Sequence, residues 1–170
     1  MNKHKTAFLL NEMDGYHLLE MYDRVIDRAD SLLKLNKFVK EALSYKADSL
    51  KSKNDFNNAI ITYNELLALD KSPDIEQTAL LGLGWCFKRT QRLDKAILCL
   101  EQLADHQPDQ AIALFNLSCY YSLDCRREES LALLKKAVEK DGRYKDLARV
   151  EEDYNYIRND PEFKKIIGDN

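Results

Sequence analysis

A single pattern of apolar and small residues recurs along this chain at intervals of about 34 positions. The clearest copy lies in residues 80–87, and residues 114–121 repeat it 34 positions later. An earlier copy in residues 43–50 lies 37 positions before the first, as a three-residue insertion would produce. A fixed period of this length indicates a repeat array in which each unit is one supersecondary element.

Each copy continues with a second small residue 12 positions after its first, and the pairs are Ala47 with Ala59, Gly84 with Ala96, and Ser118 with Ser130. Apolar residues at intervals of three and four positions surround these small residues and form a stripe on a helix. Small residues within such a stripe let a second helix approach closely. Short polar segments at 52–55, 90–92 and 124–126 separate the two halves. The pattern therefore predicts antiparallel helix pairs.

The scarcity of turn-forming residues supports an all-α fold. The chain has only five Gly and three Pro in 170 residues, whereas sandwiches and barrels need frequent turns. Asp55 and Asp94 stand where an N-cap or a first-turn acid would favour the second helix of a pair. Pro108-Asp109 is typical of a helix start.

These motifs resemble the tetratricopeptide repeat (TPR) family, and residues 77–110 match it best, with Leu83, Gly84, Ala96 and Pro108 in consensus places. Residues 40–73 and 111–144 would be two further units, although Lys46, Lys71, Ser118, Ser130 and Gly142 depart from the consensus. The resemblance implies a right-handed superhelix of helix pairs, an α-solenoid. The first helix of each pair would line a concave groove.

Residues 1–37 are expected to form an N-terminal helical cap or a degenerate repeat. Val25, Ala29 and Leu32 lie 34 positions before Ala59, Tyr63 and Leu66, which favours a repeat. Asp14-Gly15 predicts a turn between a short helix that ends near Met13 and a long helix from Tyr16 to about Leu35. The spacing of apolar residues in the long helix also suits a dimerisation seam.

Residues 145–168 are expected to cap the other end of the array. Leu147, Val150, Tyr154 and Ile157 would lie on one side of a helix over 145–158. Asp160 then predicts an N-cap for a last short helix, with Pro161 in its first turn.

Charge and composition narrow the classes of partner. The 26 basic and 29 acidic residues are interspersed, so no basic stripe exists for a phosphate backbone and nucleic acid is not expected. No segment approaches the roughly 18 apolar residues of a membrane span, and no secretory leader is recognisable. We therefore expect a cytoplasmic protein whose four cysteines are buried free thiols, with no metal site and no cofactor.

The family frame transfers a set of candidate groove residues to this chain. These residues are Asp48, Thr78, Leu81, Trp85, Lys88, Arg89, Ile112, Phe115 and Cys119. Five of them are apolar where a solvated groove would be polar, and an exposed aromatic patch usually marks a binding surface. The hypothesis is a groove for an apolar or amphipathic peptide, with Trp85 and Phe115 as anchors. The alternative is that the N-terminal helix or tighter packing covers these residues.

Two other functions are disfavoured. Family members that grip the carboxylate tail of heat-shock chaperones need Lys, Arg and Asn at positions held here by Ser44, Asp48, Gly82, Ile112 and Asn116, so no cationic clamp remains. Catalysis is not expected either. No carboxylate pair falls on groove positions, and no His is placed to lower the pKa of the Cys119 thiol.

The sequence therefore predicts a peptide-binding adaptor or scaffold. One alternative is a homo-oligomer in which the N-terminal helices of one molecule dock onto the groove of the next. A second alternative is a secretion chaperone, because class II chaperones of type III secretion resemble this chain in length and repeat number. The long charged C-terminal cap departs from that class.

Overall fold

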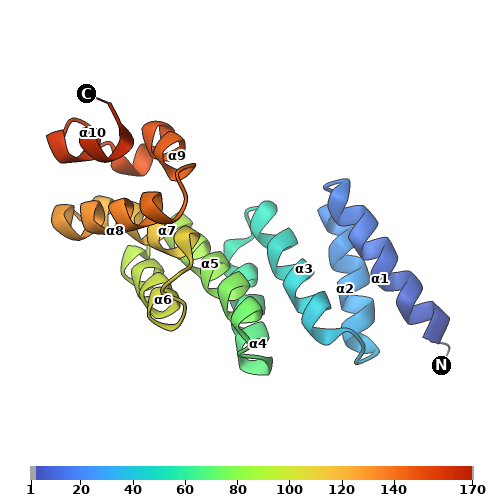
Figure 1. Ribbon diagram of the computed structural model, residues 1–170. Coiled ribbons are helices and arrows are strands. Elements are labelled where there is room, and N and C mark those ends of the chain that lie inside the picture. The colour runs from blue at the N-terminus through green and yellow to red at the C-terminus, as the bar shows by residue number, and fades with distance from the viewer. Residues whose placement is uncertain (1–2, 170) are drawn as a thin grey trace. The chain divides into compact units, whose positions relative to one another are not determined.

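The computed structural model describes residues 3–169, with side chains from residue 6 onward. All regular elements in this part of the chain are helices, so the prediction of an all-α fold is confirmed (Figure 1). The elements are α1 (Lys3–Leu18), α2 (Tyr22–Lys34), α3 (Val39–Ser52), α4 (Phe56–Leu69), α5 (Pro73–Arg89), α6 (Leu93–His106), α7 (Ala111–Leu123), α8 (Arg127–Lys140), α9 (Tyr144–Val150), the 3₁₀ helix η1 (Glu152–Tyr154) and α10 (Pro161–Ile167).

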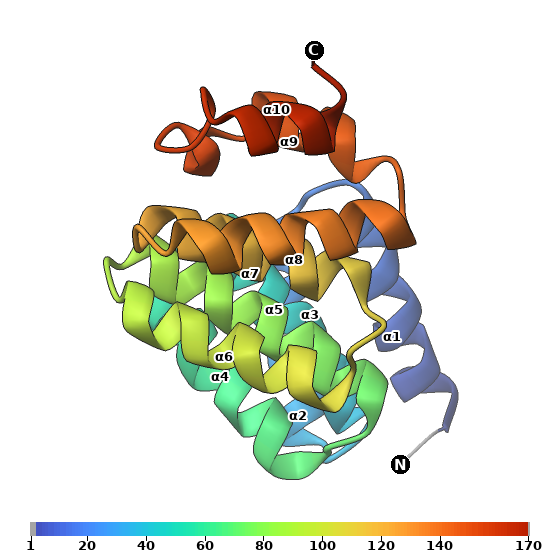
Figure 2. The ribbon, with the colours of Figure 1, turned by 60° about the vertical axis from the view of Figure 1, so that its left-hand side comes forward.

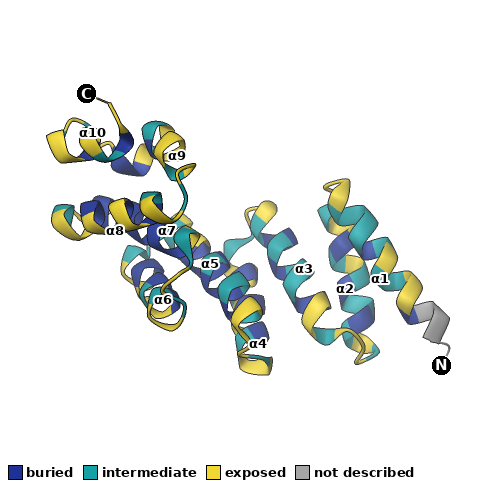
Figure 3. Ribbon diagram, viewed as in Figure 1, coloured by how far each residue is buried: buried dark blue, intermediate teal, exposed yellow. Residues whose placement is uncertain are grey.

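The chain forms two compact units, Met1–Gln91 with α1 to α5 and Arg92–Asn170 with α6 to α10. In the first unit each helix packs against the next one. In addition, α3 contacts both α1 and α5, so the first helices of successive pairs form one layer. Figure 3 shows that α2, α3 and α4 each bury one side and expose the other. This is the arrangement that an apolar stripe on each helix produces.

The turn inside each helix pair has the same backbone conformation. Glu20, Asn54, Gln91 and Cys125 all have φ near +60°, and each lies two residues before the second helix of its pair begins. They are separated by 34, 37 and 34 positions, which reproduces the spacing of the sequence repeat. Asp55 caps α4 as predicted, because its side chain accepts a hydrogen bond from the backbone N–H of Asn58.

The predicted turn at Asp14-Gly15 is wrong. Helix α1 continues through both residues to Leu18, and the turn falls around Glu20. Met13 is fully buried in a core cluster with Val25, Ala29, Leu32 and Ala42, against which Tyr16 also packs. A glycine inside a helix costs only about 1 kcal/mol, and the apolar contacts on both sides of it outweigh that cost.

Pro108-Asp109 does not begin a helix, contrary to the prediction. The carbonyl of Gln107 accepts a hydrogen bond from the N–H of Gln110, so residues 107–110 form a turn that precedes α7. Proline is favoured at the second position of such a turn because its fixed φ suits that position.

The C-terminal cap packs on α7 and α8 in the second unit (Figure 2). A continuous helix over 145–158 was expected, but α9 ends at Val150 and leaves Leu147 and Val150 exposed. The backbone is extended at Glu151 and starts η1, which turns Tyr154 inward to full burial. The last helix is as predicted, since Asp160 accepts hydrogen bonds from the N–H groups of Glu162 and Phe163.

Candidate peptide-binding surface

Three helices of the first unit meet around the side chain of Tyr63. This residue of α4 is fully buried, and its ring lies against Gly82 of α5 so closely that a Cβ at residue 82 would overlap it. Its hydroxyl donates a hydrogen bond of 2.6 Å to Asp48 of α3. Burial, followed by the nearby Asp48 carboxylate, raises the pKa of the Tyr63 hydroxyl. Tyr63 therefore ties α3, α4 and α5 together.

Asp48 was predicted to line the groove, and the structure gives its carboxylate two partners within the unit. One oxygen accepts from the hydroxyl of Tyr63 and from Lys51 Nζ, at 2.6 and 2.8 Å. The bond from Tyr63 joins α4 to α3, whereas Lys51 lies on α3 together with Asp48. The sequence pattern identified Asp48 but not its partner Tyr63, which only the packing of α4 reveals.

Four of the predicted residues form one strip along α5. Thr78, Leu81, Trp85 and Lys88 follow one another at helical spacing, and the side chain of Trp85 is 46% exposed. The ammonium group of Lys88 lies 5.8 Å from the centroid of the Trp85 ring, within the range of a cation–π contact. The predicted residue Arg89 lies elsewhere, with its guanidinium 5.9 Å from the ring of Phe56. We call these four residues the Trp85 strip.

The prediction that Phe115 and Cys119 line an open groove is wrong. Both are buried within the second unit, whereas Ile112 on the same helix is 37% exposed. The ring of Phe115 lies 4.7 Å from that of Tyr144 and 5.9 Å from that of Tyr154, measured between centroids. The C-terminal cap therefore covers this part of α7 and removes Phe115 as a binding anchor.

A hydrogen-bonded cluster fixes the cap on α7. The hydroxyl of Tyr154 donates to Ser118 Oγ, which donates in turn to the carbonyl of Ser130 at 2.7 Å. Ser130 Oγ donates back to the carbonyl of Ser118 at 2.8 Å. These serines occupy the small-residue positions of the repeat, where α7 and α8 cross. Their hydroxyls are satisfied there, as buried polar groups require.

Residues 3–169 offer neither a metal cluster nor a membrane span. No group of three or more His, Cys, Asp or Glu side chains in this range could hold a metal ion. None of the helices in the same range combines the length and the apolar character that crossing a bilayer requires.

Successive helices that pack against their neighbours within each unit, with a residue of positive φ in the turn of each pair, define the class of helical repeat solenoids. Residues 41–73 and 78–110 both match the tetratricopeptide repeat family. The chain is therefore a tetratricopeptide repeat protein, and it has the fold of a protein-interaction scaffold. No curated protein sequence matches it.

Solved structures share this fold at low sequence identity. The structure described as MamA RS-1 ArsTM double mutant has a TM-score of 0.79 and 19% identity, over 99% of this chain and 92% of that one. MamA 41-end from Desulfovibrio magneticus RS-1 has a TM-score of 0.76 and 19% identity, over 99% and 96%. YrrB, described as a TPR protein with an unusual peptide-binding site, has a TM-score of 0.71 and 15% identity, over 95% and 82%.

Proposed function

We propose that the Trp85 strip binds an apolar or amphipathic peptide segment of a partner protein. The observation that carries the proposal is the 46% exposure of the only Trp in the chain, on a helix that packs against α3 and α4. Trp is strongly enriched among the residues that dominate binding energy. A rigid helix holds such an anchor with little loss of entropy on binding.

The surroundings of Trp85 suit a peptide that has both apolar and polar side chains. Leu81 extends the apolar surface by one turn, while Thr78 and Lys88 provide polar ends. The hydroxyl of Thr78 donates to the carbonyl of Asp74 at 2.9 Å, which fixes its rotamer. YrrB, a TPR protein with an unusual peptide-binding site, shares the fold, and this supports a similar role here. Tetratricopeptide proteins are generally non-enzymatic, and we propose the same for this chain.

Selection of displayed random peptides on the immobilised protein tests this proposal. Selected peptides should shift the fluorescence of Trp85 to shorter wavelength, because binding removes the indole from water. Replacing Trp85 by Ala should weaken their binding by more than about tenfold. Leu98→Ala is the matched control, since Leu98 is 62% exposed on α6 and outside the strip. Equal binding to the wild-type and Trp85→Ala proteins would contradict the proposal.

We also propose the division into repeats at 40–73, 77–110 and 111–144, with a cap at 145–168 and a degenerate repeat in residues 1–37. Supporting the last assignment, Glu20 has the positive φ found at Asn54, Gln91 and Cys125. Val25, Ala29 and Leu32 are fully buried, as the positions 34 residues later predict. A reducing compartment such as the cytoplasm suits the four free thiols.

Self-assembly is a second candidate because large apolar side chains are exposed on α1 and in the turn that follows it. Phe8 and Leu18 are 61% and 83% exposed, and Leu19 beside them is 70% exposed. A terminal helix of a repeat array normally presents a polar outer face to water. We propose that two copies of the chain pair through these exposed side chains. Light scattering should show a dimer that Phe8→Ser with Leu18→Ser dissociates, while Leu98→Ser leaves it intact. A monomeric wild-type protein at all concentrations would contradict this.

A further inference from the structure

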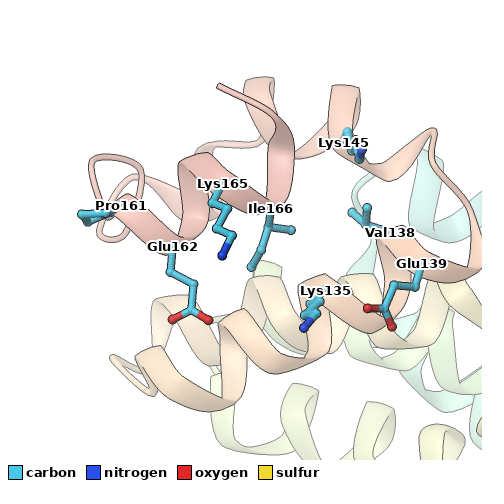
Figure 4. Close-up of a pocket in the computed structure, with 8 residues that line it drawn as sticks. All are labelled: Lys135, Val138, Glu139, Lys145, Pro161, Glu162, Lys165 and Ile166. Carbon is cyan, nitrogen blue, oxygen red and sulfur yellow. The ribbon is translucent and has the colours of Figure 1, made fainter. Parts of the chain in front are cut away.

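A cavity lies in the C-terminal part of the second unit, and its lining shares no residue with the Trp85 strip. It has a volume of about 520 Å³ and opens between α8 on one side and α9 and α10 on the other (Figure 4). Its lining consists of Lys135, Val138, Glu139, Lys145, Pro161, Glu162, Lys165 and Ile166. Clefts of roughly 300–1,000 Å³ are typical of sites that bind small ligands or short peptide segments.

The apolar part of the lining comes from two helices. Val138 of α8 and Ile166 of α10 are half-buried, and Figure 4 shows both beside the opening between the helices. Pro161 adds an exposed ring at the start of α10. Val138 and Ile166 offer a small apolar surface that a single aliphatic side chain of a ligand could cover.

Three lysines surround this apolar surface, one from each of α8, α9 and α10. In the part of the chain that the structure describes, Lys135, Lys145 and Lys165 form no ion pair. Two other cations of α8 are paired, Arg127 with Asp160 and Lys140 with Asp109. The lining also holds Glu139 and Glu162, so the five charged side chains carry a net charge of 3 − 2 = +1.

We propose that this cavity binds an acidic peptide segment that carries an apolar side chain. The lysines would attract its carboxylates while the aliphatic side chain covers Val138 and Ile166. Every lining residue is exposed or half-buried, so the ends of a bound segment could continue past the cavity. A lysine side chain is flexible and carries a compact charge, so it can follow carboxylates in different positions. The lining of the cavity contains no arginine, whose planar group would bind a carboxylate in one fixed orientation. This favours a variable acidic stretch of a partner.

The cavity would give the protein a binding site that does not depend on the Trp85 strip. A partner carrying two suitable segments, or two different partners, could be held at once. Attraction between exposed charges of this kind mainly raises the association rate, and salt weakens this attraction. Binding at the cavity should therefore be salt-dependent, whereas binding at the mostly apolar Trp85 strip should change little.

Fluorescence anisotropy of a labelled peptide that alternates Glu and Leu tests the inference. We expect binding at low salt that fails when Gln replaces Glu or when Ser replaces Leu. Lys165→Glu should weaken binding by about tenfold or more. Lys164→Glu is the matched control, because Lys164 is also exposed on α10 but does not line the cavity. This control should retain binding.

Three outcomes would overturn the inference. One is no binding of the Glu-Leu peptide at low salt. Another is an equal loss for Lys164→Glu and Lys165→Glu, which would show a response to net charge alone. The third is full displacement of the peptide by a free aliphatic carboxylate such as octanoate, which would identify the cavity as a small-molecule site. Both lysines are exposed, so circular dichroism should confirm that each variant is folded.

Discussion

The hydroxyl of Tyr154, in the C-terminal cap, donates a hydrogen bond of 2.9 Å to Ser118 Oγ at the crossing of α7 and α8. Both residues are fully buried. The cap is thus part of the core of the second unit and covers the surface that Phe115 would otherwise expose. A serine at this small-residue position, in place of glycine or alanine, provides the acceptor that the tyrosine needs.

Two serines of α7 allow a matched test of this arrangement. Ser118→Ala should destabilise the protein by about 1–3 kcal/mol, because it removes the hydrogen bond from the buried hydroxyl of Tyr154 and the one to the carbonyl of Ser130. Ser122 is equally buried, but its Oγ has no hydrogen-bond partner. Ser122→Ala should therefore be neutral or stabilise by up to about 1 kcal/mol. Urea unfolding measures both, and equal losses would show that the hydrogen bonds of Ser118 contribute nothing specific.

Two glycines should respond in opposite ways to alanine. Gly82→Ala should cost more than about 2 kcal/mol, because the new methyl group would overlap the ring of Tyr63. Gly15 also lies inside a helix, but nothing lies within 4 Å of a Cβ at that position. Gly15→Ala should stabilise by about 0.5–1 kcal/mol through helix propensity. Thermal unfolding compares them, and a stabilising Gly82→Ala would contradict the close packing of α4 on α5.

The pH dependence of stability should include a contribution from Asp70. Its hydrogen bond to Lys40 and those to Ser72 lower the pKa of the carboxyl group from 3.8 to about 2. A lowered pKa means stability that is present above the unfolded value and lost as the pH falls from about 3.8 toward 2. Asp70→Asn should therefore lower the free energy of unfolding at pH 6 and make its decrease between about pH 4 and pH 2 less steep. Urea unfolding at a series of pH values measures this, and the same decrease in the wild-type and variant proteins would contradict it.

The four thiols should differ sharply in reactivity. Cys125 is exposed at the turn before α8, while Cys86 and Cys119 are buried. Burial raises the pKa of the Cys99 thiol to about 11, which keeps it protonated near neutral pH. A brief treatment with iodoacetamide should modify Cys125 alone, as mapped by mass spectrometry. In a time course, Cys125→Ser should abolish the rapid part of the labelling. Rapid labelling of Cys119 would show that the C-terminal cap opens.

The repeat period made much of the fold predictable. It located the helix pairs and the buried register of Val25, Ala29 and Leu32, because each helix must place an apolar stripe against its neighbours. The end of α1 was misplaced, since the local turn signal of Asp14-Gly15 is weaker than the packing of Met13 and Tyr16. Local propensity yields to tertiary contacts in such cases.

The candidate site was less predictable because it depends on contacts between distant segments. Thr78, Leu81, Trp85 and Lys88 were transferred from the family resemblance, and because they lie at helical spacing they share one strip of α5. The burial of Phe115 depends on Tyr144 and Tyr154, which lie far along the chain. One feature of the sequence indicated the burial of Phe115: the segment 111–123 contains no charged residue. A helix that is apolar all round is normally buried on every side.

The central claim is that Trp85 presents an open surface to a partner. Acrylamide quenching of the fluorescence of this single Trp in the full-length protein tests it most directly. The 46% exposure of the side chain predicts emission typical of an indole in contact with water, readily quenched by acrylamide. Peptides selected for binding should then protect it from quenching. Short-wavelength emission that acrylamide hardly quenches would show that Trp85 is covered and would contradict the proposed function.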